Sequence, residues 1–401
     1  MRSSRRGFIA GAAALAATSA AMQPASGQFH PLTPITPVPF APQAAPQASV
    51  AVIGPLSGPA AAAGQQLVNG VRGAFDDANG IGGIMDHFWL FRPFDDQNTL
   101  ATALLQSRFA MDDTTQSLVI GHLSGTITSQ MVRYYNDGNI GLVVPAATTD
   151  SITAQGYRNV FRLPTKDSTE GLLHAKFVKA EKRGRRIAVV YQDADYGPDV
   201  AGTFLKQTAA DGFATFDIKL ARGNPDFGAA LHAITGNQAD LVFFAGLAPV
   251  LGPLIPALRT AGWNGAFDGS AGFFDPGLWP SYGKQAEGVI VSSSMPPLQI
   301  VPAALAIQTQ YEQRYGPMTP IAAFAYAAAQ IFIAAVRRFN STSRLMVARA
   351  IAQPIAIDTL VGSFTFDPFG DPQDPNVYYY QLQNGSWRYL RAAHPSSYIV
   401  R

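Results

Sequence analysis

Two apolar runs that each end in a small, hydroxyl-bearing loop constrain the fold of this chain most strongly. They are residues 118–120 with the loop 121–126, and residues 140–144 with the loop 145–149. A helical pattern lies between them, so this stretch predicts a strand, a helix and a second strand. In an open α/β sheet, ligands bind outside the carboxyl ends of the strands. Ser124, Thr126 and Thr148 would therefore face one crevice, together with backbone N–H groups that favour anions at helix starts.

The same alternation of strand and helix patterns continues along the chain. Further strand-like runs lie at residues 49–55, 88–94, 186–192, 213–220, 240–246 and 289–292, whereas 302–352 is mainly helical. Alternation of this kind predicts parallel sheets with right-handed crossovers. At 401 residues the chain exceeds what one hydrophobic core usually supports. The predicted fold class is therefore α/β, with two doubly wound parallel-sheet lobes.

The first 48 residues predict export. Residues 4–9 have the twin-arginine pattern SRRGFI, and an alanine-rich apolar stretch too short to span a bilayer follows. We expect a twin-arginine export signal over residues 1–27 and a periplasmic protein, with an ordinary Sec leader as the alternative. Residues 28–48 are proline-rich without a period, which predicts a disordered spacer. The chain has no cysteine, so we do not expect a lipoprotein anchor.

The composition excludes several classes of function. Formal net charge is +2, and three of the arginines lie in the first six residues, so the rest of the chain carries no basic field for nucleic acid. None of the six histidines has metal-ligand spacing with a carboxylate or another histidine, and His122 has no evident partner acid. Signatures of serine hydrolases and phosphate loops are also missing. We therefore expect no catalytic residue, no metal and no cofactor.

The two loops resemble a known family. The residues IGHLS at 120–124, PAAT at 145–148, Gly156-Tyr157 and Phe161-Arg162 are similar to the matching parts of the periplasmic branched-chain amino-acid binding proteins. These are the type I solute-binding proteins of ABC importers, and the resemblance runs from about Ser49 to the end of the chain. It implies a non-enzymatic, monomeric protein that captures a small molecule and delivers it to ABC permease subunits in the inner membrane.

The resemblance also implies how the chain divides. The first lobe would comprise residues 49–165 with 296–363, and the second lobe residues 166–295 with 364–401. Three crossings would form a hinge between the lobes, which would close over the ligand as periplasmic binding proteins do.

The resemblance places the ligand's carboxylate at Ser124 and Thr148 and its amino group at the carbonyl of Ala146. Gly125 stands where the family often has a second serine, so that only its N–H remains. Tyr196 falls on a cleft position from which its ring and hydroxyl can reach a ligand. Thr126 and Ala147 complete the two loops. The alternative interpretation is that Ser124 and Thr148 cap helices and that Tyr196 is a core tyrosine.

Three positions depart from leucine-binding relatives. Leu247 replaces an aromatic residue, Ala271 replaces an acid that pairs with the α-ammonium, and Ala63 replaces a tryptophan that walls the pocket. An unpaired buried ammonium costs several kcal/mol, so standard branched-chain amino acids should be lost unless Asp195 or Asp268 substitutes. We expect a ligand with a carboxylate or amide head and a larger apolar body.

Two other roles remain open for the same fold. One is a ligand-sensing subunit of a regulatory system, and the other is a carrier of a hydrophobic lipid. Fold-level resemblance supports binding far better than it identifies a substrate.

Overall fold

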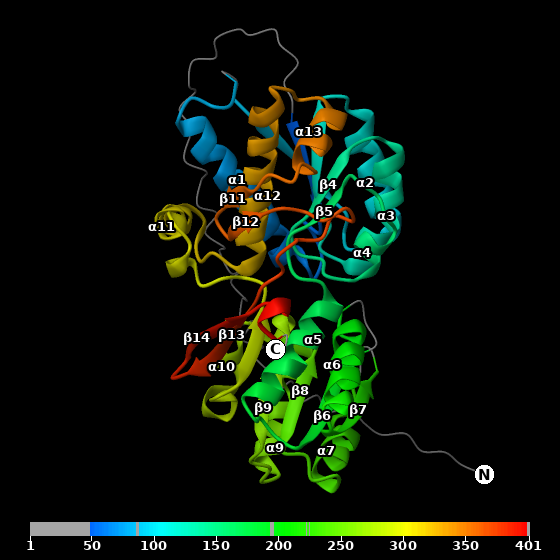
Figure 1. Cartoon of the computed structure of the whole chain (residues 1–401), viewed down its shortest axis with the longest axis vertical. Helices are drawn as coiled ribbons and strands as arrows, with labels where there is room; N and C mark the ends of the chain where they lie inside the picture. Colours follow the sequence, from blue (N-terminus) through cyan, green and yellow to red (C-terminus); the bar gives the residue numbers. More distant parts are fainter. Residues whose placement is uncertain (1–48, 86–87, 193–195, 222, 224, 399–401) are drawn as a thin grey trace, which may run out of the picture. The chain divides into compact units, whose positions relative to one another are not determined.

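The computed structural model describes residues 49–85, 88–192, 196–221, 223 and 225–398 (Figure 1). The expected export signal and the expected spacer lie outside these residues. The described chain folds into two large sheets with helices on both faces, which agrees with the predicted α/β fold class. The first sheet is wholly parallel, and the second is parallel except for its two C-terminal strands.

The first sheet has five parallel strands in the order β2-β1-β3-β4-β5. They are β1 (Ser49–Gly54), β2 (Leu90–Asp95), β3 (Gln116–Gly121), β4 (Gly141–Val144) and β5 (Val160–Arg162). One face packs on α1 (Ala61–Gly80), α12 (Pro320–Phe339) and α13 (Arg344–Ile351), and the other on α2 (Leu100–Asp112) and α3 (Gly125–Asp137). Along β1, Val50 and Val52 enter the first core and Ala51 and Ile53 the second, which explains its continuous apolar pattern.

The second sheet has seven strands in the order β14-β13-β10-β9-β8-β6-β7. They are β6 (Arg186–Gln192), β7 (Ala214–Leu220), β8 (Leu241–Ala245), β9 (Ala266–Gly269), β10 (Ile290–Ser293), β13 (Val377–Gln383) and β14 (Ser386–Ala393). Strands β13 and β14 form a hairpin, and β13 joins the sheet antiparallel to β10.

Shorter elements and further helices complete the fold. In chain order they are α4 (Ser151–Ala154), α5 (Asp167–Ala180), α6 (Pro198–Ala210), α7 (Phe227–Gly236), α8 (Ala248–Leu251), α9 (Leu254–Thr260), η1 (Ala271–Phe273), α10 (Leu278–Tyr282), η2 (Gly283–Ala286), η3 (Leu298–Ile300), α11 (Ala304–Tyr315), β11 (Ile357–Thr359), β12 (Gly362–Phe364) and η4 (Pro395–Tyr398). Helices α5 and α6 pack against each other beside the second sheet (Figure 1).

Helix α12 is the central helix of the first core. The Thr319 hydroxyl accepts a hydrogen bond from the Ala322 N–H, and Pro320 occupies the first turn, a combination typical of helix starts. The helix is long and apolar enough to cross a membrane, but 72% of that apolar window is buried. It is therefore a core helix, and it packs along α1.

Three chain segments connect the two sheets, and they meet at Thr165. Its N–H donates to the Ser294 hydroxyl (2.9 Å) and its own hydroxyl donates to the Asn376 carbonyl (2.9 Å). These residues belong to the first, second and third crossing in turn, and a cavity of about 150 Å³ lies among the three segments. The crossings are thus hydrogen-bonded to one another rather than independent strands.

The third crossing is anchored to β5 before it leaves the first sheet. Gly370 has φ +92°, and a Cβ there would meet the Val160 carbonyl oxygen at 1.8 Å, so only glycine fits. Its carbonyl accepts the Arg162 N–H (2.9 Å), and Phe366 still packs in the first core. The lobe boundaries drawn from the sequence stay a prediction, and these contacts favour placing the last boundary after Asp371.

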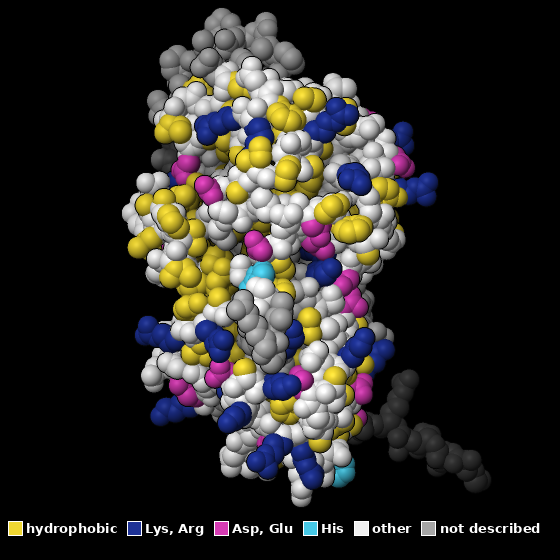
Figure 2. Space-filling view, in the orientation of Figure 1, with side chains coloured by type: hydrophobic (Ala, Val, Ile, Leu, Met, Phe, Trp, Pro, Cys, Tyr) yellow, Lys and Arg dark blue, Asp and Glu magenta, His cyan; other side chains and the backbone are white. Residues whose placement is uncertain are grey.

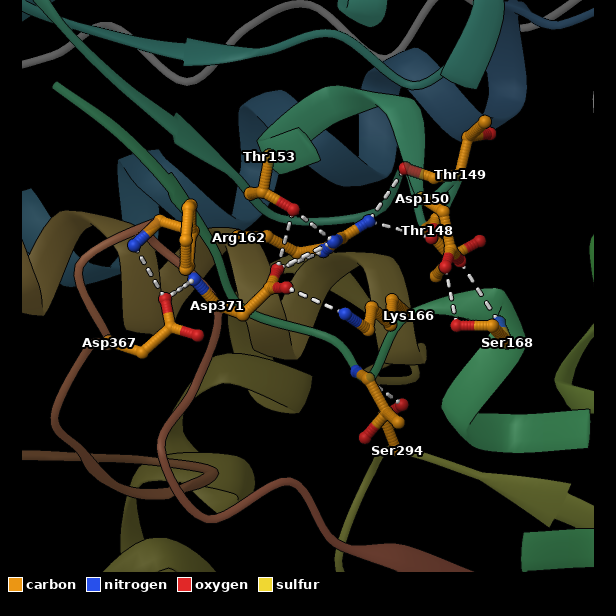
Figure 3. A network of polar contacts seen from close by, with 12 residues as sticks. Thr148, Thr149, Asp150, Thr153, Arg162, Lys166, Ser168, Ser294, Asp367 and Asp371 are labelled. Atoms are coloured by element: carbon orange, nitrogen blue, oxygen red, sulfur yellow. Dashed lines mark hydrogen bonds and ion pairs between the residues drawn. The ribbon is translucent and has the colours of Figure 1, made fainter. Parts of the chain in front are cut away.

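The Arg162 guanidinium holds this anchor together (Figure 3). Its side chain is fully buried and donates to Asp371 Oδ1 at 3.0 Å from Nε and 2.5 Å from Nη2, while Lys166 Nζ lies 3.3 Å from Asp371 Oδ2. Burial alone would raise the pKa of Asp371, but the charge of Arg162 and hydrogen bonds from Arg162 and Thr153 lower it overall. Asp371 is therefore the counter-ion that makes burial of Arg162 tolerable.

We expect Asp371→Ala to lower the free energy of unfolding by about 3–5 kcal/mol, because it leaves the buried Arg162 charge without its carboxylate. Urea denaturation of the folded protein measures this loss. Asp374→Ala is the matched control, since the Asp374 side chain is 82% exposed, and its effect should stay within about 0.5 kcal/mol. Equal losses in the two variants would contradict the assignment.

Candidate functional site

The first predicted loop lies at the carboxyl end of β3. Ser124 is the N-cap of α3, and its hydroxyl accepts a hydrogen bond from the Ile127 N–H (3.3 Å). Gly125 is buried and Thr126 is exposed. The capping role that the sequence offered as an alternative is therefore present, and it is compatible with anion binding because both use the same end of the helix.

A buried polar chain supports this loop from behind. The His122 ring nitrogens lie 2.7 Å from Asp96 Oδ2 and 2.7 Å from the Tyr135 hydroxyl, which in turn lies 2.6 Å from the Ser107 hydroxyl. The sequence gave no sign of Asp96 as the partner of His122, so the expectation of a histidine without an acid is wrong. All four side chains are buried in the first lobe, and they hold the residue two places before Ser124.

The second predicted loop follows β4 and is held by Arg162. The guanidinium donates to the carbonyls of Thr148 and Thr149, each at 2.7 Å. The Thr148 carbonyl also accepts the N–H of Asp167 (3.1 Å), the first residue of α5. Ala146 and Thr148 are partly exposed, whereas Ala147 is buried. Since β3 and β4 are neighbours in the sheet, the two loops share one edge.

The second lobe brings Tyr196, Leu247 and Ala271 together. Gly272 lies among them, because a Cβ on it would meet Tyr196 Cε1 at 2.7 Å and Leu247 Cδ2 at 3.0 Å. Tyr196 is partly exposed and Leu247 is 50% exposed, so both can contact a ligand. Ala63 lies in the first turn of α1, after the carboxyl end of β1, and no hydrogen bond or ring contact between described residues joins it to the others.

Sequence reasoning missed two carboxyl groups of this site, both in the first turn of α5. Glu170 is buried and accepts hydrogen bonds from the Tyr196 hydroxyl (3.1 Å) and the Ala271 N–H (2.6 Å). Asp167 is also buried, and neither of its carboxyl oxygens has a hydrogen-bond partner within the described part of the chain. The spacing of three residues puts both side chains on one helix face, but nothing in the sequence indicates their burial.

Burial, together with the nearby charges of Glu170, Asp150 and Asp199, raises the pKa of Asp167 to about 8. The Asp167 side chain is therefore largely an uncharged carboxylic acid at neutral pH. In that form it can donate one hydrogen bond and accept others.

Of the two acids that the sequence offered as substitutes, Asp268 does not fill the place left by Ala271. Asp268 is buried and bound by Arg183, whose Nη2 and Nε lie 2.6 Å and 3.0 Å from Oδ1, with His174 Nε2 at 3.4 Å from Oδ2. Asp195 lies outside the described residues. Among the residues that the structure does describe, no cluster of histidine, aspartate or glutamate is arranged to hold a metal ion.

Known proteins resemble this chain over most of its length. The model of a family described as periplasmic binding protein matches residues 47–386. The leucine-specific-binding protein of Salmonella typhimurium is 28% identical over 325 residues, which cover 80% of this chain and 87% of that protein. The Leu/Ile/Val-binding protein of Citrobacter freundii is 27% identical with the same coverage.

Solved structures share the fold. A leucine binding protein of Thermotoga maritima superposes with a TM-score of 0.79 at 21% identity, covering 87% of this chain and 99% of that one. A solute binding protein of an ABC transporter from R. palustris, solved in complex with benzoate, gives a TM-score of 0.76 at 21% identity, covering 87% and 97% of the two chains. A second protein from R. palustris, in complex with 4-hydroxybenzoate, gives 0.74 at 20% identity, covering 86% and 97%.

We expect the stability of the protein to fall as pH rises from about 5 to 9, because the folded state holds the Asp167 proton with a pKa of about 8, against 3.8 for an ordinary aspartate carboxyl. A raised folded-state pKa gives stability that is present below the unfolded value and is lost as pH rises through the folded value. The asparagine of Asp167→Asn cannot ionise, so this variant should not lose stability in this way. Its unfolding free energy should therefore rise relative to that of the native chain as pH rises over this range. Urea titrations at several pH values test this, with Asp112→Asn, whose side chain is 70% exposed, as the control. A constant difference between Asp167→Asn and the native chain would refute the role of Asp167.

Proposed function

Since the chain belongs to the periplasmic binding protein family, we propose that it captures a small carboxylate or amide with an apolar body and delivers it to an ABC importer. Members of this family are binding proteins of the periplasm and not enzymes. The proposed ligand lies between the loops after β3 and β4 on one side and Tyr196, Leu247 and Ala271 on the other.

The observation that carries this proposal is the position of Ser124 and Thr148. They follow the carboxyl ends of two adjacent strands, and Ser124 caps a helix of 13 residues. An anion at this edge would gain from the helix dipole and from backbone N–H groups. The proposed role of Ser124 and Thr148, together with Gly125, Thr126, Ala146 and Ala147, is therefore to hold the head group.

The second-lobe side of the site argues against a standard branched-chain amino acid. Ala271 offers no carboxylate to an α-ammonium, and Asp167 is largely uncharged at neutral pH because burial raises its pKa to about 8. Leu247 and Ala63 leave more apolar space than the aromatic residues of leucine-binding relatives would. Neighbours of the same fold that were solved with benzoate and with 4-hydroxybenzoate support aromatic acids as candidates.

The protein must also be exported and must meet its permease. We propose that residues 1–27 direct export by the twin-arginine route, that the protein is not a lipoprotein, and that it works as a monomer with inner-membrane permease subunits. On the face of the molecule drawn in Figure 2, basic and acidic side chains are interspersed. This is expected for a protein whose partner is a small molecule rather than nucleic acid.

Native mass spectrometry of the exported protein, followed by denaturation, is the experiment that tests this function. We expect release of a carboxylic acid or an amide, and isothermal titration should detect no micromolar binding of leucine, because its ammonium would lie unpaired in the site. Release of a lipid, or micromolar leucine binding, would overturn the proposed ligand class.

We expect Ser124→Ala to raise the Kd of the released ligand about tenfold or more, because a hydrogen bond to a charged group contributes roughly 1.5–3 kcal/mol. Ser129→Ala is the matched control in the same helix, since the Ser129 hydroxyl donates to the Gly125 carbonyl (2.9 Å) within the helix itself. Isothermal titration of both variants measures the effect. An unchanged Kd for Ser124→Ala would remove Ser124 from the site.

A further inference from the structure

Helix α5 packs on the second sheet, but it begins against a loop of the first sheet (Figure 3). The N–H of Asp167, its first residue, donates to the Thr148 carbonyl (3.1 Å). The N–H of Ser168 donates to Asp150 Oδ1 (3.0 Å), and the Ser168 hydroxyl donates to Asp150 Oδ2. Thr148 and Asp150 both follow β4, so two N–H groups at the start of a second-sheet helix are bonded to a first-sheet loop.

Asp150 takes the place of a local N-cap. The first N–H groups of a helix have no carbonyl partner inside the helix, and a side-chain oxygen usually accepts one of them. Lys166 precedes α5, and its side chain makes no such hydrogen bond. The carboxylate of Asp150 accepts it instead, from 18 residues earlier in the chain, and its negative charge lies at the favourable end of the helix dipole. The helix is therefore capped from the other lobe.

The start of α5 is also where the lobes are hydrogen-bonded outside the crossings. Within residues 49–85, 88–192, 196–221, 223 and 225–398, the hydrogen bonds that join a loop of the first sheet directly to a helix of the second are those of Thr148 and Asp150. Thr148 contributes a backbone carbonyl, which every residue has. Asp150 contributes a side chain, so its replacement can change this contact.

This contact sets the distance between the two sides of the proposed site. The loop after β4 carries Thr148, which is proposed to hold the head group. The first turn of α5 carries Glu170, which accepts hydrogen bonds from the Tyr196 hydroxyl (3.1 Å) and the Ala271 N–H (2.6 Å) on the opposite side. Movement of α5 away from the loop would therefore widen the site.

Neighbouring acids oppose the contact that the helix end favours. Partial burial and the charge of Asp150 raise the pKa of Asp199, in the first turn of α6. The charge of Asp150, after burial and the charge of Glu170, also contributes to the raised pKa of Asp167. Like charges repel, so the carboxylate of Asp150 gains from the start of α5 and loses from these neighbours. A contact with opposing contributions can form and break as the lobes close and open.

We infer that Asp150 is a positioning residue that caps α5 across the cleft between the lobes and thereby favours the closed arrangement. Its loss should weaken binding of any ligand held between the lobes, although Asp150 acts through α5 and not through the ligand. The inference rests on the proposed function, because closure changes affinity only if the ligand contacts both lobes. Asp150 would then control affinity without selecting among ligands.

Three variants separate the cap from other effects of the residue. Asp150→Ala removes both acceptors of Ser168. Asp150→Asn keeps an acceptor for the Ser168 N–H, and asparagine caps helices about as well as aspartate, so it should restore native behaviour. Ser151→Ala is the matched control, since Ser151 is the next residue of the same loop and is exposed.

A readout that needs no ligand measures the closure itself. The chain has no cysteine, so cysteines introduced by Gln130→Cys on α3 and Lys206→Cys on α6, both exposed positions, can carry spin labels without background. We expect the same distances between the labels in the native protein, Asp150→Asn and Ser151→Ala. In Asp150→Ala the ratio of closed to open protein should fall about fivefold, the change that loss of one N-cap gives. An unchanged distance distribution in Asp150→Ala would overturn the inference, even if that variant lost stability in urea.

Isothermal titration with benzoate and with 4-hydroxybenzoate measures the effect on binding. We expect Asp150→Ala to raise the Kd of both acids about fivefold and to leave the ratio of the two Kd values unchanged. An unchanged Kd, or a changed ratio, would contradict the inference. If neither acid bound the native protein, the proposed ligand class would fail, while the distances in the ligand-free protein would still decide the role of Asp150.

Discussion

Burial of one arginine constrains both the hinge and one wall of the candidate site. The guanidinium of Arg162 is inaccessible to water, so each of its donors must find an acceptor inside the protein. Asp371 of the third crossing and the carbonyls of Thr148 and Thr149 supply these acceptors. A buried ion pair is seldom more stable than an apolar contact of the same size. Its effect here is geometric, because it places the crossing and the loop relative to β5.

Glu170 is the buried charged side chain on the second-lobe side of the first crossing, as Arg162 is on the first-lobe side. Arg162 ends β5 just before this crossing, and Glu170 lies in the first turn of α5 just after it. One side chain therefore orders the loop after β4, and the other orders Tyr196 and the backbone of Ala271. The four residues 163–166, which join β5 to α5, include Thr165, at which the three crossings meet. Any rearrangement of the crossings would be transmitted to polar groups in both lobes.

The sequence predicts those parts of the structure that depend on local patterns. The strands β3 and β4, the helix between them and the capping position of Ser124 all follow from apolar runs and small polar residues. Partnerships between distant residues do not follow, such as Asp96 with His122 or Arg162 with Asp371. The sequence shows that alanine stands at position 271, where leucine-binding relatives have an acid. It does not show that the Glu170 carboxyl, on helix α5, accepts a hydrogen bond from the Ala271 N–H. Acids in a first turn are usually explained by the helix dipole, so their burial at a binding site was not indicated.

Helix α12 has a consequence for how the protein can leave the cytoplasm. Its 20 residues are long and apolar enough to cross a membrane, and apolar length is a property on which lateral insertion into a bilayer depends. In the folded chain the same residues lie against α1 in the core. A chain that folds before export, as the twin-arginine motif predicts, therefore never offers this helix to the bilayer.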